Sequence, residues 1–455
     1  MTSIISAGMN SLPEFTYENT ILLDDGIYTN INLIISNEGT FSNPIIIKPK
    51  NNGKVYFTES VNILITGKFI ILSNIIFTNG KGSVKLQGSN NRITNCEFSL
   101  NAGDGPIINI HKYNNRLDHN IFKDFSNGNP WVQVSRNGSS DYIIIDSNVF
   151  MNRKKGTGNG FETIRFGLSQ TSLSQSHSVI ENNIFENCNG EIEIISNKAG
   201  GNIYYKNTFK TSFGSLTLRH GNKVLVAKNK FLQDNADNAG GIRIAAGSGH
   251  TIYNNLFKNT NNRAALIVNS GSNGDIYNIP VSYSKFLKNI FLDCSLDIMI
   301  GSLQFPIAPR ECSFHDNVVI KNNNNPVYQI NSDISKNEFK NNIYKVNNMG
   351  NIPNEQIYGN DFSLNVNMTE FGSTEFGSTN VFNDIIFDNK YGDEYYKFLN
   401  KTIFDEIYQP LFHSQIINDS EYNLNYTSLP SAGSSFTYNP FTLLFLCAIS
   451  FLHIK

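Results

Sequence analysis

The amino-acid sequence predicts an all-β protein, a right-handed parallel β-helix, and three observations support this fold class. Short runs of alternating apolar and polar residues recur along the chain, for example in NNRLDHNIF, YIIIDSNVF and KVLVAKNKF. An Asn-x-Phe motif closes each run, and no stretch keeps the apolar spacing of an amphipathic helix. Neighbouring motifs lie 22 to 35 residues apart, which is typical of a solenoid with loop insertions.

The repeated motif also predicts how successive coils pack. Asparagine tolerates the left-handed backbone conformation of a turn, and its amide can hydrogen-bond to the equivalent residue one coil away. The phenylalanines are expected to stack in the core. An antiparallel sandwich would contain similar strands but gives no reason for one motif per coil. The copies begin at Asn95, Asn120, Asn148, Asn183, Asn207, Asn229, Asn255 and Asn289, with further copies expected at Asn74, Asn317 and Asn342.

Length and composition limit the class of protein. A chain of 455 residues can bury a large core, and its formal net charge of −2 argues against a nucleic-acid partner. Charged residues make up only 16% of the chain, so asparagine, serine and threonine supply much of the polar surface, as suits an extracellular or carbohydrate-facing protein. The five cysteines form no CxxC pair, which disfavours a structural zinc site.

The periodicity divides the chain into three parts. We expect a β-helix domain over residues 1–348, an irregular extension rich in Asn, Tyr and Ser over 349–430, and a cleaved lipid-anchor signal over 431–455. The last part joins small residues to the apolar tail FTLLFLCAISFLHIK, which is the pattern of such a signal. The first residues show no export signal, so we expect the natural chain to begin upstream of Met1.

Secretion or attachment to the cell surface is therefore the expected location. Glycosylation would accompany it, because five N-x-S/T sequons occur, at Asn137, Asn367, Asn400, Asn418 and Asn425. We expect a monomer.

The segment GEIEIISNK followed by LTLRHGN holds the strongest candidates for chemistry. In a strand, Glu191 and Glu193 would project from one face while Ile192 and Ile194 point inward. Together with Lys198 and Arg219, they are candidates for metal ligands, a base and an anion-stabilising group. Stacking of similar strands predicts one outer column of charged residues, which comprises Arg165, Glu193, Arg219 and Arg243. A purely structural charge ladder, in which the acid only neutralises the arginines, would have the same pattern.

These motifs resemble polysaccharide lyase family six, which contains alginate lyases and chondroitinase B. The similarity rests on NGFETIRFG from Asn159, GEIEIISNK, LTLRHGN and GGIRI, and it is densest from about Asn148 to Phe257. The resemblance implies a calcium ion bound by Asn159, Glu191 and Glu193. It also implies Lys198 as the base and Arg219 as the acid.

The chemistry of a uronic acid agrees with this set. Removing its C5 proton requires the adjacent carboxylate to be neutralised, which a hard cation with oxygen ligands can do. A lysine is a base only when neutral, and positive charge from a metal ion and Arg219 favours that form. Because a guanidinium rarely gives up its proton, we interpret Arg219 as an electrostatic stabiliser that helps to deliver a proton, for example through water.

Three further residues are candidates for binding substrate. His220 is either a buried structural histidine or part of the site. Arg243 binds a substrate carboxylate or pairs with a glutamate. Arg165 orients Glu193 or binds sugar.

The sequence thus predicts a calcium-dependent lyase that cleaves an acidic polysaccharide by β-elimination, with alginate, in particular polymannuronate, as the favoured substrate. The alternatives are a chondroitinase B-like lyase acting on dermatan or chondroitin sulfate, and a non-catalytic β-helix that binds glycans or adheres to cells.

Overall fold

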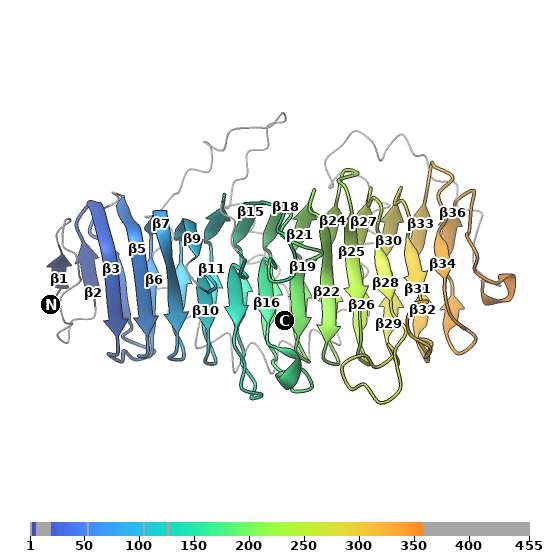
Figure 1. The fold of residues 1–455 in the computed structure, drawn as a ribbon, viewed down its shortest axis with the longest axis horizontal. Coiled ribbons are helices and arrows are strands. Elements are labelled where there is room, and N and C mark those ends of the chain that lie inside the picture. The colour runs from blue at the N-terminus through green and yellow to red at the C-terminus, as the bar shows by residue number, and fades with distance from the viewer. Residues whose placement is uncertain (1, 6–19, 52–53, 103–104, 125–127, 358–455) are drawn as a thin grey trace, which may run out of the picture. The chain divides into compact units, whose positions relative to one another are not determined.

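A computed structural model shows the arrangement of the chain and describes residues 2–5, 20–51, 54–102, 105–124 and 128–357 (Figure 1). Within these ranges it contains 36 strands and two short 3-10 turns, η1 (Ser169–Thr171) and η2 (Asn354–Gln356). The strand pairs between coils are parallel, and each coil adds its strands to the same sheets as the coil before. The predicted parallel β-helix is confirmed.

Two sheets form the walls of the solenoid. The smaller sheet has 14 strands in chain order, one per coil: β1 (Thr2–Ile5), β2 (Thr20–Leu23), β4 (Ile45–Pro49), β6 (Ile70–Ser73), β8 (Arg92–Thr94), β11 (Arg116–Asp118), β14 (Ile144–Asp146), β17 (Val179–Glu181), β20 (Ile203–Tyr205), β23 (Leu225–Ala227), β26 (Thr251–Tyr253), β29 (Lys285–Leu287), β32 (Ser313–His315) and β35 (Glu338–Lys340).

The larger sheet has 22 strands and divides into two ladders, because the long strand β7 pairs with both β9 and β10. Ladder I comprises β3 (Gly26–Ile35), β5 (Val55–Ile65), β7 (Ile75–Leu86), β10 (Ile108–Ile110), β13 (Val132–Val134), β16 (Ile164–Phe166), β19 (Glu193–Lys198), β22 (Gly214–His220), β25 (Ala239–Ile244), β28 (Leu266–Val268), β31 (Ile298–Ile300) and β34 (Tyr328–Ile330). Ladder II comprises β9 (Glu97–Ala102), β12 (Ile121–Lys123), β15 (Val149–Arg153), β18 (Ile184–Cys188), β21 (Thr208–Lys210), β24 (Lys230–Leu232), β27 (Leu256–Lys258), β30 (Ile290–Leu292), β33 (Val318–Ile320) and β36 (Ile343–Lys345).

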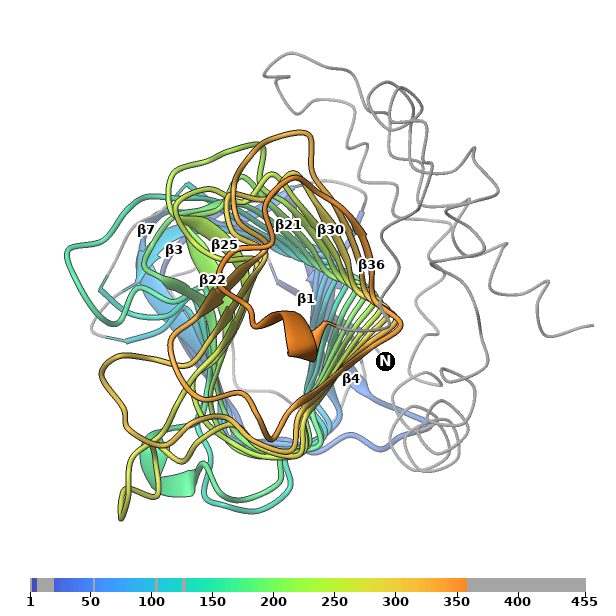
Figure 2. The same cartoon turned by 90° about the vertical axis from the view of Figure 1, so that its right-hand side faces the viewer.

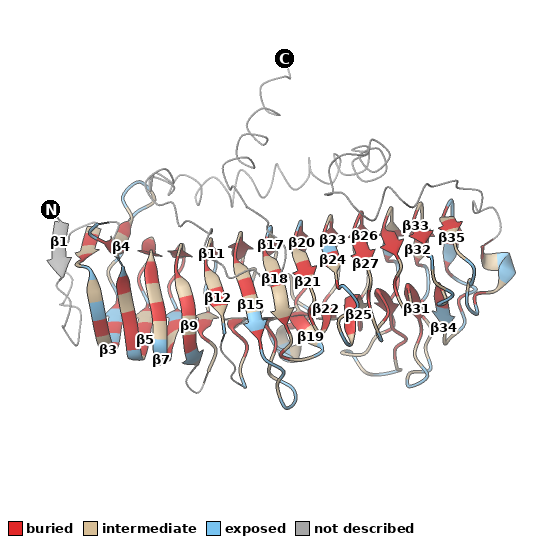
Figure 3. Ribbon diagram, turned by 90° about the horizontal axis from the view of Figure 1, so that it is seen from above, coloured by how far each residue is buried: buried red, intermediate tan, exposed pale blue. Residues whose placement is uncertain are grey.

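The view along the solenoid shows the strands surrounding its interior (Figure 2), and most of the buried apolar side chains belong to one core cluster. In the long strands β3, β5 and β7, buried residues largely alternate with intermediate or exposed ones, whereas short strands such as β8 and β11 are buried throughout (Figure 3). One column of core side chains consists of the predicted phenylalanines. From Phe77 to Phe291 the rings stack coil on coil, with centroids 4.5 to 5.0 Å apart. Each such pair contributes about 0.5–1.5 kcal/mol beyond its buried area.

The predicted asparagine ladder is also confirmed. The backbone N–H of Asn183 donates to Oδ1 of Asn207 (3.1 Å), and that of Asn207 donates to Oδ1 of Asn229 (2.9 Å). The same link runs without a break from Asn120 to Asn342, so the copies expected at Asn317 and Asn342 belong to it. The side-chain amides replace hydrogen bonds that a turn would otherwise leave unmade in the interior.

The left-handed conformation lies one residue earlier than predicted. His119, Lys206 and Lys228 have φ between 53 and 55°, and each directly precedes a ladder asparagine. At the start of the ladder, Asn95 itself holds this conformation (φ 53°), and the backbone N–H of Cys96 donates to Asn120 in its place. This arrangement explains why the motif at Asn95 is one residue longer than the others.

The predicted extension and anchor signal lie almost entirely outside the described residues. Of the segment 349–430, the structure describes only residues 349–357, and it describes none of 431–455. In the part of the chain that is described, no helix has the length and apolar character needed to cross a membrane.

Replacing Asn207 with alanine tests the ladder. The change leaves the buried N–H of Asn183 without its acceptor, so we expect the free energy of unfolding to fall by about 1–3 kcal/mol. Thermal and urea unfolding measure this loss. Asn325→Ala, at an exposed position, is the matched control and should change stability by less than about 0.5 kcal/mol. Equal effects of the two changes would contradict the proposed role of the ladder.

Candidate active site

The candidate residues lie on neighbouring strands of ladder I. Glu193 and Lys198 are the first and last residues of β19, and Arg219 and His220 end β22 on the next coil. Lys198 is the pairing partner of His220 across the two strands. The pairing shifts register twice, between Glu193 and Ile195 and between Asn197 and Lys198. Such bulges redirect side chains at the edge of a regular ladder.

The bulges break the single column that the sequence predicts. Arg165 is in register with Ser196, which pairs with Thr217, which in turn pairs with Arg243. Glu193 pairs with Ser215 instead. The prediction is wrong because it aligned strands by alternation alone, and an inserted residue changes the pairing without changing the alternation.

The same irregularity turns one apolar side chain outward. Ile194 is buried as predicted, whereas Ile192 is 39% exposed. Glu191 and Ile192 precede β19, so they do not follow its pleat. The prediction that both isoleucines point inward is therefore wrong for Ile192, which lies between the two candidate acids.

Three carboxylates surround the start of β19. Oε1 of Glu191 accepts a hydrogen bond from the backbone N–H of Gly160 (3.2 Å). Burial, followed by the charges of Glu162 and Glu193, raises the pKa of Glu191 from an ordinary 4.5 to about 7. Glu162 is 1% exposed, and its Oε2 has no hydrogen-bond partner among the described residues. Sequence reasoning missed Glu162, although it lies in the motif NGFETIRFG.

This excess of negative charge fits a hard cation. Asn159 is exposed, and it directly precedes Gly160, whose backbone N–H donates to Glu191. One amide and two carboxylates are oxygen donors of the kind that calcium prefers, and a divalent ion would relieve the repulsion that raises the pKa of Glu191. Among the described residues, no three His, Cys, Asp or Glu side chains are grouped to hold a metal ion, so the amide and a substrate or water would have to complete such a site.

Arginines cluster on the other side of Glu193. Its Oε1 lies 3.8 Å from Nε of Arg219 and 3.7 Å from Nη1 of Arg243. Arg243 thus pairs with a glutamate, one of its two predicted roles. A third guanidinium belongs to Arg263, where burial and then Arg243 lower the pKa. The charges of three arginines therefore act on Glu193.

Sequence reasoning missed Arg263 because it lies in a turn outside the strand pattern. Its position depends on Gly240 in the motif GGIRI. A Cβ atom at residue 240 would lie 2.5 Å from Cδ of Arg263, so glycine leaves room for the arginine to cross the coil. Nε of Arg263 has no hydrogen-bond partner within the described part of the chain.

Arg165 does not reach Glu193. Its Nη2 donates to Oε1 of Gln133 (2.5 Å), and its Nη1 lies 3.8 Å from Oε1 of Glu162. Arg165 therefore orients a different glutamate from the one predicted, and it connects the carboxylates to the preceding coil.

His220 is buried at 5% exposure and is held by a distant loop. Its Nδ1 lies 2.8 Å from the carbonyl oxygen of Tyr277, and the two rings are 5.5 Å apart. A carbonyl only accepts, so Nδ1 carries the proton and Nε2 is left with its lone pair. Burial, and then Arg219, lowers the pKa of His220 to about 4, so the ring is neutral at physiological pH.

Comparison with known proteins identifies the family. A family model described as Chondroitinase B matches residues 9–388. The structure of the family-six alginate lyase AlyGC superposes with a TM-score of 0.71 and 25% identity, covering 79% of this chain and 53% of AlyGC. The chain thus spans about half the length of AlyGC. No curated protein sequence matches the chain.

A second solved structure is a mannuronic acid specific family-six lyase from the human gut microbiota. It covers 88% of this chain and 94% of its own, with a TM-score of 0.66 and 23% identity. A family-six alginate lyase in complex with a trisaccharide gives a TM-score of 0.69 at 20% identity, over 80% of this chain and 88% of its own. Both likenesses concern the fold. The chain belongs to the Chondroitinase B family, and the resemblance of its motifs to family six is confirmed.

The raised pKa of Glu191 predicts a pH dependence of stability in calcium-free protein. A carboxyl with a folded pKa above its unfolded value stabilises the fold below pH 4.5 and loses that contribution as pH rises through about 7. We therefore expect the melting temperature in chelator to fall over this range, and Glu191→Gln to flatten the fall. Added calcium should stabilise the wild type more at pH 8 than at pH 5.

The exposed Glu355→Gln is the control and should keep the wild-type pH profile. Parallel loss of stability in wild type and Glu191→Gln would show that other groups cause the dependence.

Proposed function

We propose that this protein is a lyase that cleaves a uronic-acid polysaccharide by β-elimination. The observation that supports the proposal is the position of Lys198 on ladder I. It lies at the end of the strand that begins with Glu193, directly across from the strand end that holds Arg219 and His220. A base, a cationic group and a carboxylate cluster therefore meet over two adjacent coils.

The chain's own residues supply the proton transfers. Lys198 takes the C5 proton of the uronate through Nζ, and the C5–H electron pair is delocalised into the adjacent carboxylate as an enolate. The electron pair then forms the C4=C5 double bond as the C4–O4 bond breaks, and the leaving oxygen takes a proton from water positioned by Arg219. Calcium, when bound by Asn159, Glu191 and Glu193, would neutralise the substrate carboxylate and so favour loss of the C5 proton.

The arginines stabilise the charge that develops. Arg219 is 34% exposed and Arg243 is 23% exposed, so both guanidiniums can face a substrate while Glu193 fixes their position. Preoriented cations of this kind stabilise a developing enolate more than they stabilise the ground state. Neutral His220 adds no charge, and with Nδ1 held by Tyr277 its Nε2 can accept a hydrogen bond from Lys198 or from substrate.

Alginate is the proposed substrate, with polymannuronate as the preferred block. Solved structures with the same fold are named as alginate lyases, and one is named as mannuronic acid specific. The alternative is dermatan or chondroitin sulfate, which the name of the matching family model favours. A β-helix that binds glycans without cleaving them is the rival from a different class.

Far-ultraviolet absorbance of new unsaturated uronate ends tests the reaction. The full chain is incubated with alginate, polymannuronate, dermatan sulfate or pectate, each with calcium and with chelator. Absorbance that rises on one polymer identifies the substrate class. Binding without any rise in absorbance, from a folded sample, would favour the non-catalytic rival.

Lys198→Ala should lower kcat at least about 100-fold on the polymer that the wild type cleaves, because it removes the general base. The matched control is Lys210→Ala on ladder II, which should keep wild-type kcat. Circular dichroism confirms that both variants fold. Activity of Lys198→Ala near the wild-type level would assign the base to another residue.

Arg219→Ala should lower kcat by about 10²–10³ with a smaller change in KM, because its positive charge matters most in the transition state. Arg219→Lys keeps the charge and should recover part of the loss. A change in KM alone would instead make Arg219 a ground-state binding residue.

A further inference from the structure

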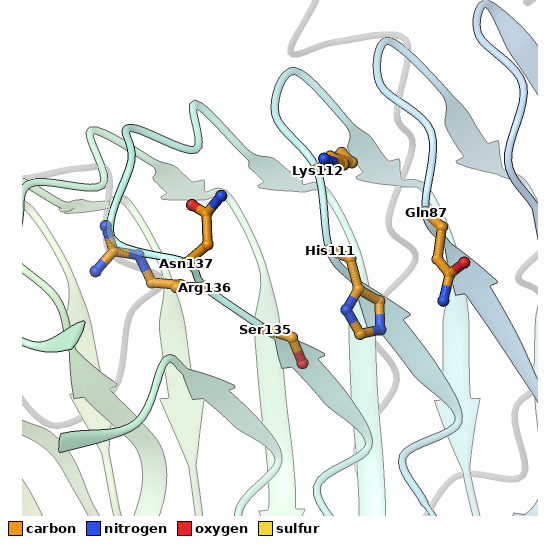
Figure 4. A pocket seen from close by; sticks show the side chains of 6 residues that line it. All are labelled: Gln87, His111, Lys112, Ser135, Arg136 and Asn137. Atoms are coloured by element: carbon orange, nitrogen blue, oxygen red, sulfur yellow. The ribbon is translucent and has the colours of Figure 1, made fainter. Parts of the chain in front are cut away.

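A pocket of about 390 Å³ lies on ladder I, away from the carboxylate cluster. Figure 4 shows Gln87, His111 and Ser135 as a row on successive coils, with Lys112 beside them. Arg136 and Asn137 complete the lining. The mechanism proposed above uses none of these residues.

Strand pairing places this pocket in the same column as Lys198. Five residues are paired in succession along ladder I, namely Leu86, Ile110, Val134, Phe166 and Asn197. The residue after each therefore occupies an equivalent position, and these residues are Gln87, His111, Ser135, Gly167 and Lys198. Three coils separate His111 from Lys198, which is about 14 Å at about 4.8 Å per coil.

The residues between them are small. Ser135 and Gly167 occupy the two intermediate positions of the column. Gly167 has φ +66°, and a Cβ atom there would lie 3.0 Å from both the carbonyl oxygen of Lys198 and Cδ of Arg136. A larger residue at position 167 would be strained and crowded. No large side chain therefore projects from the column between the pocket and Lys198.

The pocket is positively charged. Lys112 is exposed at its rim, and burial followed by the charges of Lys85 and Lys112 lowers the pKa of His111. No acidic side chain contributes to that shift. Arg136 adds no free charge, because it pairs with Asp141 and donates to the carbonyl oxygen of Gln175 (3.0 Å). The two lysines thus favour an anion, while neutral His111 and Gln87 offer hydrogen bonds.

We propose that this pocket is a distal subsite that binds a uronate carboxylate of the same polysaccharide whose cleaved bond lies at Lys198. The inference rests on the proposed function. One coil advances by about the length of one sugar unit, so a chain lying along the column brings a uronate to Lys112 about three units from the cleaved bond. A trimer cleaved at Lys198 is too short to reach this pocket.

Asn137 connects this subsite to glycosylation. It lines the pocket and begins the sequon Asn-Gly-Ser. A glycan attached there would compete with the substrate for the pocket. The test therefore uses protein made without N-glycosylation, and Asn137→Gln checks that the asparagine itself is not required.

The test compares long and short substrates. Lys85→Gln/Lys112→Gln should raise KM about tenfold for the cleaved polymer and leave KM for its trimer unchanged, with kcat preserved for both. Lys210→Gln, at a partly exposed position on ladder II, controls for general loss of charge and should change neither. An equal KM for the double variant and the wild type on the polymer, or an equal rise on polymer and trimer, would overturn the subsite.

A binding arm separates this inference from the proposed function. Calorimetry measures polymannuronate and alginate binding to Lys198→Ala, with and without the two lysine changes. If the two lysine changes weaken binding about tenfold, the subsite is supported even when the wild type cleaves no polymer. Absence of cleavage would then refute only the proposed lyase activity. Unchanged binding refutes the subsite even if the wild type is an active lyase.

Discussion

Parallel pairing from coil to coil is the constraint on which the other features depend. It sets each residue beside its equivalent about 4.8 Å away, so a side chain repeated in sequence becomes a column in space. The buried asparagine ladder fixes this register at one corner, and the stacked phenylalanines fix it in the core. Lys198 faces His220 because both strands are held in this way. The site is therefore a consequence of how the coils stack.

Much of the fold follows from the sequence because the same residue performs the same task on every coil. Asparagine and phenylalanine recur where a buried amide and a core ring are needed. The residue that adopts the left-handed conformation at each turn is harder to predict from the sequence. Histidine, lysine, serine and asparagine all hold it, at positions such as His119, Ser147 and Lys206, so composition does not mark it.

The site is predicted in part. The structure brings together Glu193, Arg219 and Arg243, as their charges indicate. The pairing of β19 could not be predicted, because a bulge does not change the alternation of apolar and polar residues. Contacts between distant segments are also beyond sequence reasoning. Tyr277 reaches His220 through a backbone carbonyl, which any residue type can provide. Arg263 depends on space left by Gly240, 23 positions earlier in the chain, which becomes apparent only once the coils are stacked.

In a solenoid, equivalent positions on different coils are separated by a whole number of coil spacings. Each coil pairs its strands with those of the coils on either side, so evolution can insert or remove a coil and keep the strand pairing of the rest. Between Ser135 and Lys198 there are two such steps, and a coil added there would move every residue on one side by the same increment. Relatives that differ by one coil in this interval would therefore differ by one coil spacing in the distance between these two positions.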